Sequence, residues 1–399
     1  MNVREARSLF PGLKDKIFLD AAVVSLLPTP ASRAVQGIVD LATEMAGGDA
    51  SRVHVELDER RREAVTSVAH LIGASQDEIA LVESTSHGLS VAAASLPLRR
   101  GDEVIIPDTE FLQVAIPWAK LREERGIRLK FIKSHGGTFQ TKDFEAAIGR
   151  RTKVIALSSV QWASGFRADL KAIGRLCRAS KVFLVVDAIQ QVGASKLDVR
   201  ETPVDFIACG GHKWLNAPLG CGFLYIRKGL LKTLRPPLHG YLGLKEPRGG
   251  WLRYFQTPTI TPDRAYRFPR SAQTFELGGT ANYPGAVALK ASVDIVNAIG
   301  IEQIDEHIQN LVDRLIQGLD RLGLRLVSPR ERKDRAGIVS FRAYRRPEED
   351  AQLVEKLVAR KIFVSMRYTS RVGGIRVSVH YFNNEEDIDG LLDALRKLR

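Results

Sequence analysis

Several features that would assign this chain to a specialised class of protein are missing from its sequence. No stretch approaches the roughly 20 apolar residues that a membrane-spanning helix needs. The first 20 residues mix charged with apolar positions, so they lack the uninterrupted apolar core of a secretion signal. We therefore expect a cytoplasmic protein with no membrane partner.

Cysteine is also scarce. The three cysteines, Cys177, Cys209 and Cys221, include no pair at CxxC spacing and are too few for a disulfide framework. We interpret them as buried, reduced thiols. Internal repeats and low-complexity segments are absent too, and we predict no metal site.

Acidic residues are outnumbered, since 59 Lys and Arg stand against 46 Asp and Glu, a net charge of +13. Such an excess can indicate nucleic-acid binding. Here the basic residues are spread along the chain, and no RNP or zinc-finger motif accompanies them. We therefore expect no nucleic-acid partner. An anionic small molecule explains part of the charge equally well.

The length of 399 residues exceeds the about 250–300 residues that one hydrophobic core usually serves, so two domains are expected. From about residue 55 to 230, amphipathic helical patterns alternate with short apolar strands such as EVIIP (103–107) and VFLVV (182–186). This alternation predicts an α/β fold with a mostly parallel central sheet that is covered on both faces.

The predicted boundaries follow from changes in this pattern. We expect an N-terminal segment over 1–20 that packs with the small domain, a large domain over 21–283, and a small α+β C-terminal domain over 284–399. Residues 234–275 lose all periodicity and are rich in proline, glycine, arginine and aromatic residues. We interpret this stretch as an ordered excursion near the active site, because long irregular segments are usually functional or disordered.

The chemistry is concentrated in two linked segments. In VVDAIQQVG (185–193), a buried strand ends at Asp187, where α/β folds place ligands. A carboxylate in that position needs a positive partner, and a protonated pyridine nitrogen is one. Gln190 could then hydrogen-bond the phenolic oxygen of the same ring. The alternative is an aspartate that only caps a helix.

The second segment runs DFIACGGHKWLNAPLGCGFLY (205–225). Gly210 and Gly211 allow a tight turn and a close approach to a ligand, and Lys213 can form a Schiff base with an aldehyde there. A lone lysine is usually a solvated surface amine. A phosphate cradle is available in ESTSHG (83–88), whose hydroxyl groups precede a predicted helix.

Taken together, these residues resemble the class V aminotransferase family of fold-type I pyridoxal 5′-phosphate (PLP) enzymes, over nearly the whole chain. The resemblance implies that Asp187 pairs with the pyridine nitrogen, Gln190 with the phenolic oxygen, and that Lys213 carries the cofactor. It implies that Thr85, Ser86 and His212 hold the phosphate. It further implies a homodimer with shared active sites, in which Thr280 reaches the phosphate of the neighbouring subunit.

Three more positions follow from the resemblance. Phe111 in PDTEFLQVAIPW (107–118) would stack on the cofactor, where desulfurases have a histidine. Gln161 would place an amide near the ring, and Arg376 would bind the substrate α-carboxylate with two parallel hydrogen bonds. The desulfurase loop cysteine is missing, because residues 362–371 (IFVSMRYTSR) contain none.

These observations predict a PLP enzyme that acts on a small-molecule amino acid by removing the Cα proton, with Lys213 as the base. An aminotransferase is favoured. A Cβ–S lyase and an epimerase of the same family remain alternatives, since all three reactions begin in the same way. A different class of function, an idle fold-type I scaffold that only binds a partner, also stays open.

Overall fold

The computed structural model describes residues 1–44 and 49–399, and its largest element is a seven-stranded sheet. The strand order is β2-β8-β7-β6-β5-β3-β4, and only β8 runs antiparallel to its neighbours. The strands are β2 (Ile79–Val82), β3 (Glu103–Pro107), β4 (Arg128–Ile132), β5 (Thr152–Ser158), β6 (Phe183–Asp187), β7 (Phe206–Gly210) and β8 (Gly222–Ile226). The predicted mostly parallel sheet is confirmed.

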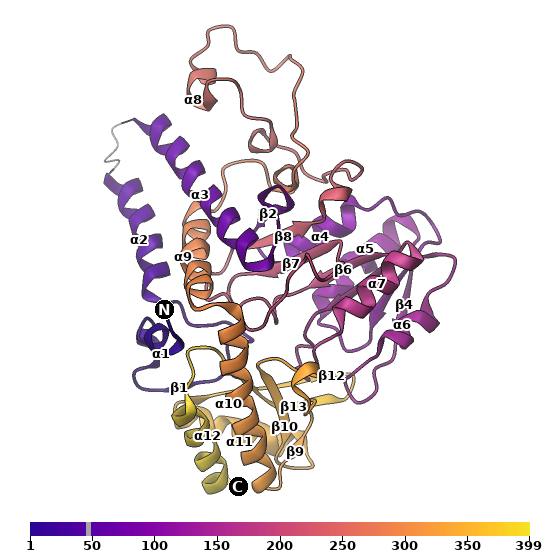
Figure 1. Ribbon diagram of the computed structural model, residues 1–399, viewed down its shortest axis with the longest axis vertical. Helices are drawn as coiled ribbons and strands as arrows, with labels where there is room; N and C mark the ends of the chain where they lie inside the picture. The colour runs from indigo at the N-terminus through magenta and orange to yellow at the C-terminus, as the bar shows by residue number, and fades with distance from the viewer. Residues whose placement is uncertain (45–48) are drawn as a thin grey trace.

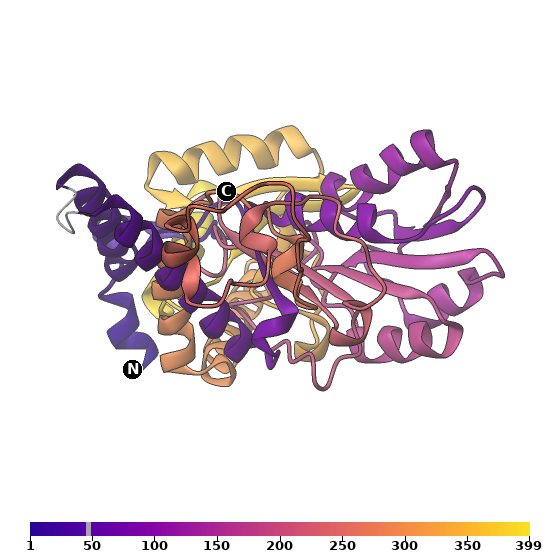
Figure 2. The same ribbon diagram turned by 90° about the horizontal axis from the view of Figure 1, so that it is seen from above.

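The central strands are apolar throughout because both faces of the sheet are covered. Successive side chains of a strand point to opposite faces. Leu184 and Val186 of β6 accordingly join one core, while Val185 between them joins the other. Figure 2 shows helices on both sides of this sheet. They are α4 (Thr85–Ser95) and α5 (Leu112–Arg125) on one face, and α6 (Thr141–Ala147) and α7 (Leu170–Ser180) on the other.

A group of long helices flanks the sheet at the left of Figure 1. It consists of α2 (Thr29–Glu44), α3 (Ala50–Ile72) and α9 (Tyr283–Ile299), with α9 packed against both others. α9 is followed at a sharp bend of 79° by α10 (Ile301–Arg321), which leads into the C-terminal domain. No single helix among the described residues is long and apolar enough to cross a membrane. The bent α9–α10 pair meets that criterion only when taken together.

The C-terminal domain is built on a four-stranded antiparallel sheet in the order β12-β13-β10-β9. Its strands and remaining helices are β9 (Arg325–Leu326), β10 (Ile338–Arg342), β12 (Ser365–Thr369), β13 (Val372–Ser378), α11 (Pro347–Ala359) and α12 (Glu385–Leu398). The N-terminal residues, with α1 (Val3–Arg7), belong to the same core. β1 (Ile17–Phe18) pairs with β11 (Ile362–Phe363), and the ring of Phe10 lies 4.8 Å from that of Phe382.

The stretch over 234–275 leaves the body of the molecule. It contains only short elements, η4 (Tyr241–Gly243), α8 (Gly250–Phe255) and η5 (Ala272–Phe275), and α8 stands at the top of Figure 1, far from the C-terminal domain. Trp251 stacks on Phe255 with 5.7 Å between ring centroids, so the aromatic residues of this excursion pack mainly on one another.

Candidate active site

A cavity of about 330 Å³ opens at the carboxyl ends of the parallel strands, next to β12 and β13 of the C-terminal domain. This volume is within the range of small-molecule sites. The cavity brings together eight of the residues singled out from the sequence: Thr85, Ser86, Phe111, Asp187, Gln190, His212, Lys213 and Arg376. Ala22, Val23, Ser84, Gln113, Trp162, Ile189 and Arg367 complete the lining, and Gln161 and Thr280 are not part of it.

Asp187 is the last residue of β6 and is only 4% exposed. One carboxylate oxygen, Oδ1, accepts a hydrogen bond of 2.9 Å from the backbone N–H of Ile189. Burial raises the pKa of Asp187 to about 6, and the nearby Lys213 opposes that rise. A carboxylate so removed from water is stabilised in its charged form when a cation occupies the cavity beside it.

Lys213 follows the turn after β7 and is half-buried. Its Nζ lies 6.0 Å from the centroid of the Phe111 ring. Burial lowers the pKa of Lys213 to about 8, and the positive charges of Arg376 and Arg367 act in the same direction. More of this amine is therefore neutral near physiological pH than for a free lysine, and only the neutral amine attacks an aldehyde.

The N-terminus of α4 supplies the hydroxyl groups at one end of the cavity. Ser84 caps the helix by accepting from the N–H of His87, and the Thr85 hydroxyl accepts from the N–H of Gly210 at 2.8 Å. A Cβ at Gly88 would lie 2.9 Å from Ala208, so a glycine lets this helix approach β7 closely. Free N–H groups, hydroxyls and the helix dipole together favour a phosphate here.

Two neutral side chains complete this part of the site. Burial lowers the pKa of His212 to about 4, so its imidazole is uncharged near neutral pH. Gln190 is held at both ends of its amide. Its Nε2 donates to the carbonyl of Ala22 at 3.2 Å, and its Oε1 accepts from the indole N–H of Trp214 at 2.7 Å. The second hydrogen on Nε2 remains available to an acceptor in the cavity.

Phe111 lies at the start of α5, 43% exposed, with its ring 5.4 Å from that of Trp162. Gln161, next to Trp162, turns away from the cavity instead. Its amide oxygen accepts from Thr109 at 2.8 Å and its Nε2 donates to the buried Glu110 at 2.6 Å. In the described part of the chain, Gln161 thus supports the loop that carries Phe111, and its contact with a cofactor stays a prediction.

Arg376 extends from β13 and is 1% exposed. Its Nη1 donates to the carbonyl of Trp162 at 2.9 Å, and its Nη2 lies 3.3 Å from the carboxylate of Asp20. Burial lowers the pKa of Arg376 to about 10. These contacts hold the guanidinium in place at the cavity wall, as is needed for a carboxylate receptor.

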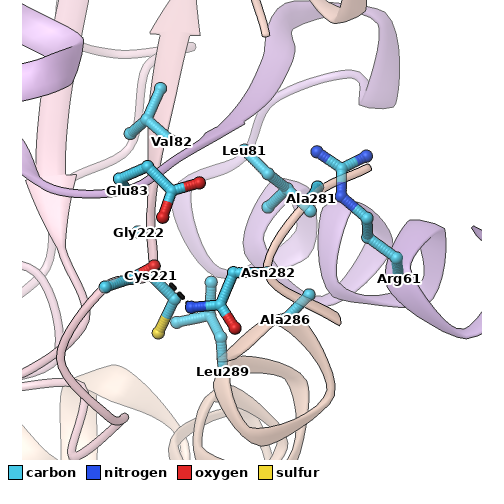
Figure 3. Close-up of a pocket in the computed structure, with 11 residues that line it drawn as sticks. Arg61, Leu81, Val82, Glu83, Cys221, Gly222, Ala281, Asn282, Ala286 and Leu289 are labelled. Atoms are coloured by element: carbon cyan, nitrogen blue, oxygen red, sulfur yellow. Dashed lines mark hydrogen bonds between the residues drawn. The ribbon is translucent and has the colours of Figure 1, made fainter. Parts of the chain in front are cut away.

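Thr280 belongs to a neighbouring region of the molecule. Its side chain hydrogen-bonds Tyr241, and the next residues, Ala281 and Asn282, line a separate small pocket. Figure 3 shows this pocket between Arg61 of α3, Leu81 and Val82 of β2, Cys221 and the start of α9. Its volume of about 20 Å³ holds about one water molecule, so it is too small for a cofactor.

Three of the seven lining residues that were not singled out from the sequence, Gln113, Trp162 and Arg367, have large polar or aromatic side chains. Gln113 and Trp162 lie inside segments that were singled out for a neighbouring residue. Arg367 lies in β12, a strand that the sequence did not reveal. The strand could have been recognised from the alternation in SMRYT (365–369), which places Ser365 and Arg367 on one face.

The residues present fit PLP. A buried carboxylate lines the cavity from β6, the hydroxyl-rich N-terminus of α4 lines it too, and an amine of lowered pKa lies 6.0 Å from the centroid of an aromatic ring in the same wall. These are the contacts that a pyridine nitrogen, a phosphate and an aldehyde require.

Known proteins with related sequences and folds agree with this interpretation. A probable cysteine desulfurase of Methanothermobacter thermautotrophicus is 29% identical and covers 100% of this chain and 98% of its own length. The isopenicillin N epimerase of Streptomyces clavuligerus is 26% identical over 96% of this chain and 97% of its own. A solved mutant of C-DES with glycine covalently linked to its PLP cofactor superposes with a TM-score of 0.86, 23% identity and 98% coverage of both chains.

The last of these shows a shared fold, that of the fold-type I PLP enzymes. The family model for class-V aminotransferases matches residues 17–391, nearly the whole chain. The protein therefore belongs to the class-V aminotransferase family and is a PLP-dependent enzyme.

Proposed function

We propose that this enzyme is an aminotransferase that acts on an α-amino acid. One observation carries the proposal: the amine of Lys213 and the guanidinium of Arg376 line the same cavity, with the carboxylate of Asp187 in its wall. A base and a carboxylate receptor around one space suit a molecule that carries both an acidic Cα–H bond and an α-carboxylate.

Each residue has a defined part in this reaction. PLP, when bound, withdraws electrons from Cα, and an ionised Asp187 sustains this by keeping the pyridine nitrogen protonated. Lys213 would hold the cofactor through its aldehyde, and its Nζ, when free, would take the Cα proton of the substrate. Arg376 fixes the α-carboxylate, which orients the Cα–H bond toward Lys213.

The cysteines favour transamination over sulfur transfer to the protein. Cys177, Cys209 and Cys221 are all buried, and none of them is among the described residues that line the cavity. Burial raises the pKa of Cys177 and of Cys221 to about 12, so neither is a thiolate near neutral pH. The hairpin of β12 and β13 contains no cysteine either. Persulfide formation on the enzyme therefore lacks a nucleophile.

Elimination from a sulfur-bearing amino acid needs no thiol of the enzyme and uses the same residues as transamination. A Cβ–S lyase is therefore the second candidate, supported by the relatives named as cysteine desulfurases. Epimerisation requires a second base on the substrate face opposite Lys213. His212 is the other titratable nitrogen base in the wall, and its lowered pKa makes it a weak one.

We also propose a homodimer in which Thr280 reaches the phosphate site of the partner. Two observations support this arrangement. Thr280 lies outside the cavity of its own subunit, and large apolar side chains are exposed at Leu112, Ile116, Leu219 and Leu277, with exposed fractions of 71%, 52%, 66% and 44%. Leu112 and Ile116 lie one turn apart on α5, and a contiguous exposed apolar patch is typical of a protein interface.

Half-reactions with the purified holoenzyme test the reaction type. Each amino acid is mixed with the enzyme, and the absorption of the lysine-bound cofactor is followed while the products are analysed. We expect the band to disappear, with one equivalent of 2-oxo acid and a cofactor left in its amine form. Sulfide or pyruvate with the original band restored would indicate a lyase, and racemised substrate an epimerase. The Lys213→Ala variant should bind cofactor without a borohydride-reducible bond and should give none of these products.

A further inference from the structure

One cation in the cavity wall has no part in the chemistry described above. Arg367 is half-buried in β12, and within the described chain its guanidinium donates one hydrogen bond, from Nη1 to the carbonyl of the adjacent Met366 at 2.8 Å. Within the described residues it has no salt bridge to a carboxylate, whereas Arg376 has Asp20. Its charge nevertheless acts on Asp20, Lys213 and Arg376, so the four groups are close together.

The register of the hairpin explains why this side chain faces the cavity. Ser365 of β12 pairs with Arg376 of β13, and Arg367 pairs with Gly374. Arg367 is therefore the diagonal neighbour of Arg376 on the same face of the sheet, and diagonal neighbours are within reach of each other's long side chains. The opposite residue, Gly374, has no side chain that could cover it.

The hairpin is also held against the large domain. The Ser370 hydroxyl, in the turn between β12 and β13, donates to the carbonyl of Asp108 at 2.6 Å. Gly137 approaches Val372 so closely that a Cβ there would lie 2.6 Å from its side chain. These contacts fix the end of β12 over the cavity mouth, so the position of Arg367 belongs to the site.

The charges of the wall are unbalanced. Lys213, Arg367 and Arg376 are cationic, and Asp187 is the one carboxylate among the lining residues, all of which the structure describes. In the proposed reaction, the cofactor uses Lys213 and Asp187, and the substrate α-carboxylate uses Arg376. Asp20, outside the wall, is already paired with Arg376 at 3.3 Å, so Arg367 is the cation of the wall that has no carboxylate bound to it within the described chain.

We propose that Arg367 binds a second carboxylate, on the side chain of the substrate, so that this enzyme acts on dicarboxylic amino acids and their 2-oxo acids. The inference rests on the proposed function and specifies its substrate class. The rings of Phe111 and Trp162, which meet edge to face at 5.4 Å, offer an apolar surface for the methylene groups between the two carboxylates.

The test compares aspartate with asparagine and glutamate with glutamine, because each amide has the shape of its acid without the charge. Half-reactions are followed for the wild-type holoenzyme and for Arg367→Gln, Arg367→Lys and Arg371→Gln. Arg371 lies on the same hairpin, is exposed and is not part of the cavity wall, so it controls for the loss of one positive charge.

We expect the wild type to prefer one of the acids over its amide. Arg367→Gln should lower kcat/KM for that acid by about 10- to 100-fold, the usual effect of losing a hydrogen bond to a charged group. It should lower kcat/KM for the amide and for alanine much less, since these lose only the influence of Arg367 on Lys213. Arg367→Lys should be intermediate, because it keeps the charge and loses the planar fork. Arg371→Gln should behave as the wild type.

A second measurement does not depend on turnover. Succinate and glutarate should shift the cofactor absorption and raise the melting temperature of the wild type more than propionate and butyrate do, and this difference should vanish in Arg367→Gln. An equal loss of rate with every amino acid in Arg367→Gln would overturn the inference, as would an unchanged acid-to-amide ratio. If no amino acid reacts with the wild type but succinate binding still requires Arg367, the proposed transamination fails while the dicarboxylate site stands.

Discussion

At the scale of single residues, the site contains charged side chains that are buried even before the ligand that neutralises them is bound. Asp187 shows the consequence, because its pKa is raised to about 6 by burial. Above that pH its ionised form opposes folding of the apoprotein, and the same charge stabilises a protonated pyridine nitrogen when PLP is bound. Ionisation of this carboxyl group therefore lowers the stability of the apoprotein and supports the activity of the holoenzyme.

Replacing Asp187 with asparagine separates the effect on stability from the effect on turnover. We expect Asp187→Asn to lower turnover by at least about 100- to 1,000-fold, as for loss of a preorganised charge in other active sites. The apoprotein should be no less stable than the wild type at pH 8, since the variant removes a buried charge. Thermal melts of the apoprotein and half-reaction rates of the holoenzyme measure the two effects. Near-normal turnover in the variant would mean that the ring nitrogen has another partner.

Glu110 is a second buried carboxyl group, with a structural part in the site. It accepts from the N–H of Ser158 at 2.8 Å and from Gln161, and it also bonds the Ser158 hydroxyl. Burial raises its pKa to about 7, and the charge of Asp187 adds to that rise. The folded protein is therefore most stable when Glu110 is protonated. In that form its neutral side chain connects β5 to the loop that carries Phe111.

A raised pKa in the folded state sets the sign of the pH dependence. The contribution of Glu110 to stability is complete below pH 4.5 and is lost as the pH rises to about 7. At about 1.4 kcal/mol per pKa unit, the loss amounts to about 3 kcal/mol. Glu110→Gln imitates the protonated form, so the variant should match the wild type at pH 4.5 and exceed its stability at pH 8. Urea unfolding of the apoproteins at both pH values measures this, with the exposed Glu145→Gln as control. An equal gain at both pH values would contradict the assignment.

At the scale of helices and strands, the sequence was most informative where burial is complete. The strand EVIIP (103–107) begins and ends as predicted, and VFLVV (182–186) is shifted by one residue, because β6 spans Phe183–Asp187. Both segments are apolar runs buried between the two helical layers.

The candidate site was predictable to the extent that it follows strand ends. Asp187 is the last residue of one buried strand and Lys213 follows the turn after another, and parallel strands bring their carboxyl ends to one edge. β12 was not predicted, because its five residues show no apolar run and its pairing with β13 joins residues across a tight turn. Arg367 was missed for that reason. The rotation of Gln161 toward Thr109 and Glu110 likewise depends on side-chain contacts between distant segments.

At the scale of the whole molecule, the excursion over 234–275 needs a partner to explain it. None of its residues is among those that line the cavity of the described chain. Its ends, at Leu234 and Phe275, are buried in the core of the large domain, and its middle part with α8 rises away from both domains (Figure 1). Phe255, Tyr266 and Phe268 are 59%, 49% and 50% exposed. If the excursion contributes to an active-site entrance, as its irregular, arginine- and aromatic-rich sequence led us to expect, the entrance belongs to the neighbouring subunit.

We therefore expect apolar contacts of the excursion to stabilise the dimer, because exposed aromatic rings lose their water contact when a second copy covers them. Phe255→Ser combined with Phe268→Ser should shift the monomer–dimer equilibrium toward the monomer by about tenfold or more, the effect of about 1.4 kcal/mol. Val358→Ser, an exposed apolar position on α11, is the control and should leave assembly unchanged. Light scattering across a dilution series reports the equilibrium.

The same variants distinguish assembly from a direct contact with substrate. Because Thr280 is proposed to reach the phosphate of the partner, the monomeric fraction should also bind PLP more weakly, in proportion to the loss of dimer. Arg253→Ala gives the complementary result: it should alter the order of preferred substrates at concentrations where the dimer is intact. If Arg253→Ala leaves that order unchanged and the paired phenylalanine variant remains a dimer, the excursion serves neither purpose. The partner's contribution to the site would then have to come from Thr280 or from the exposed residues of α5.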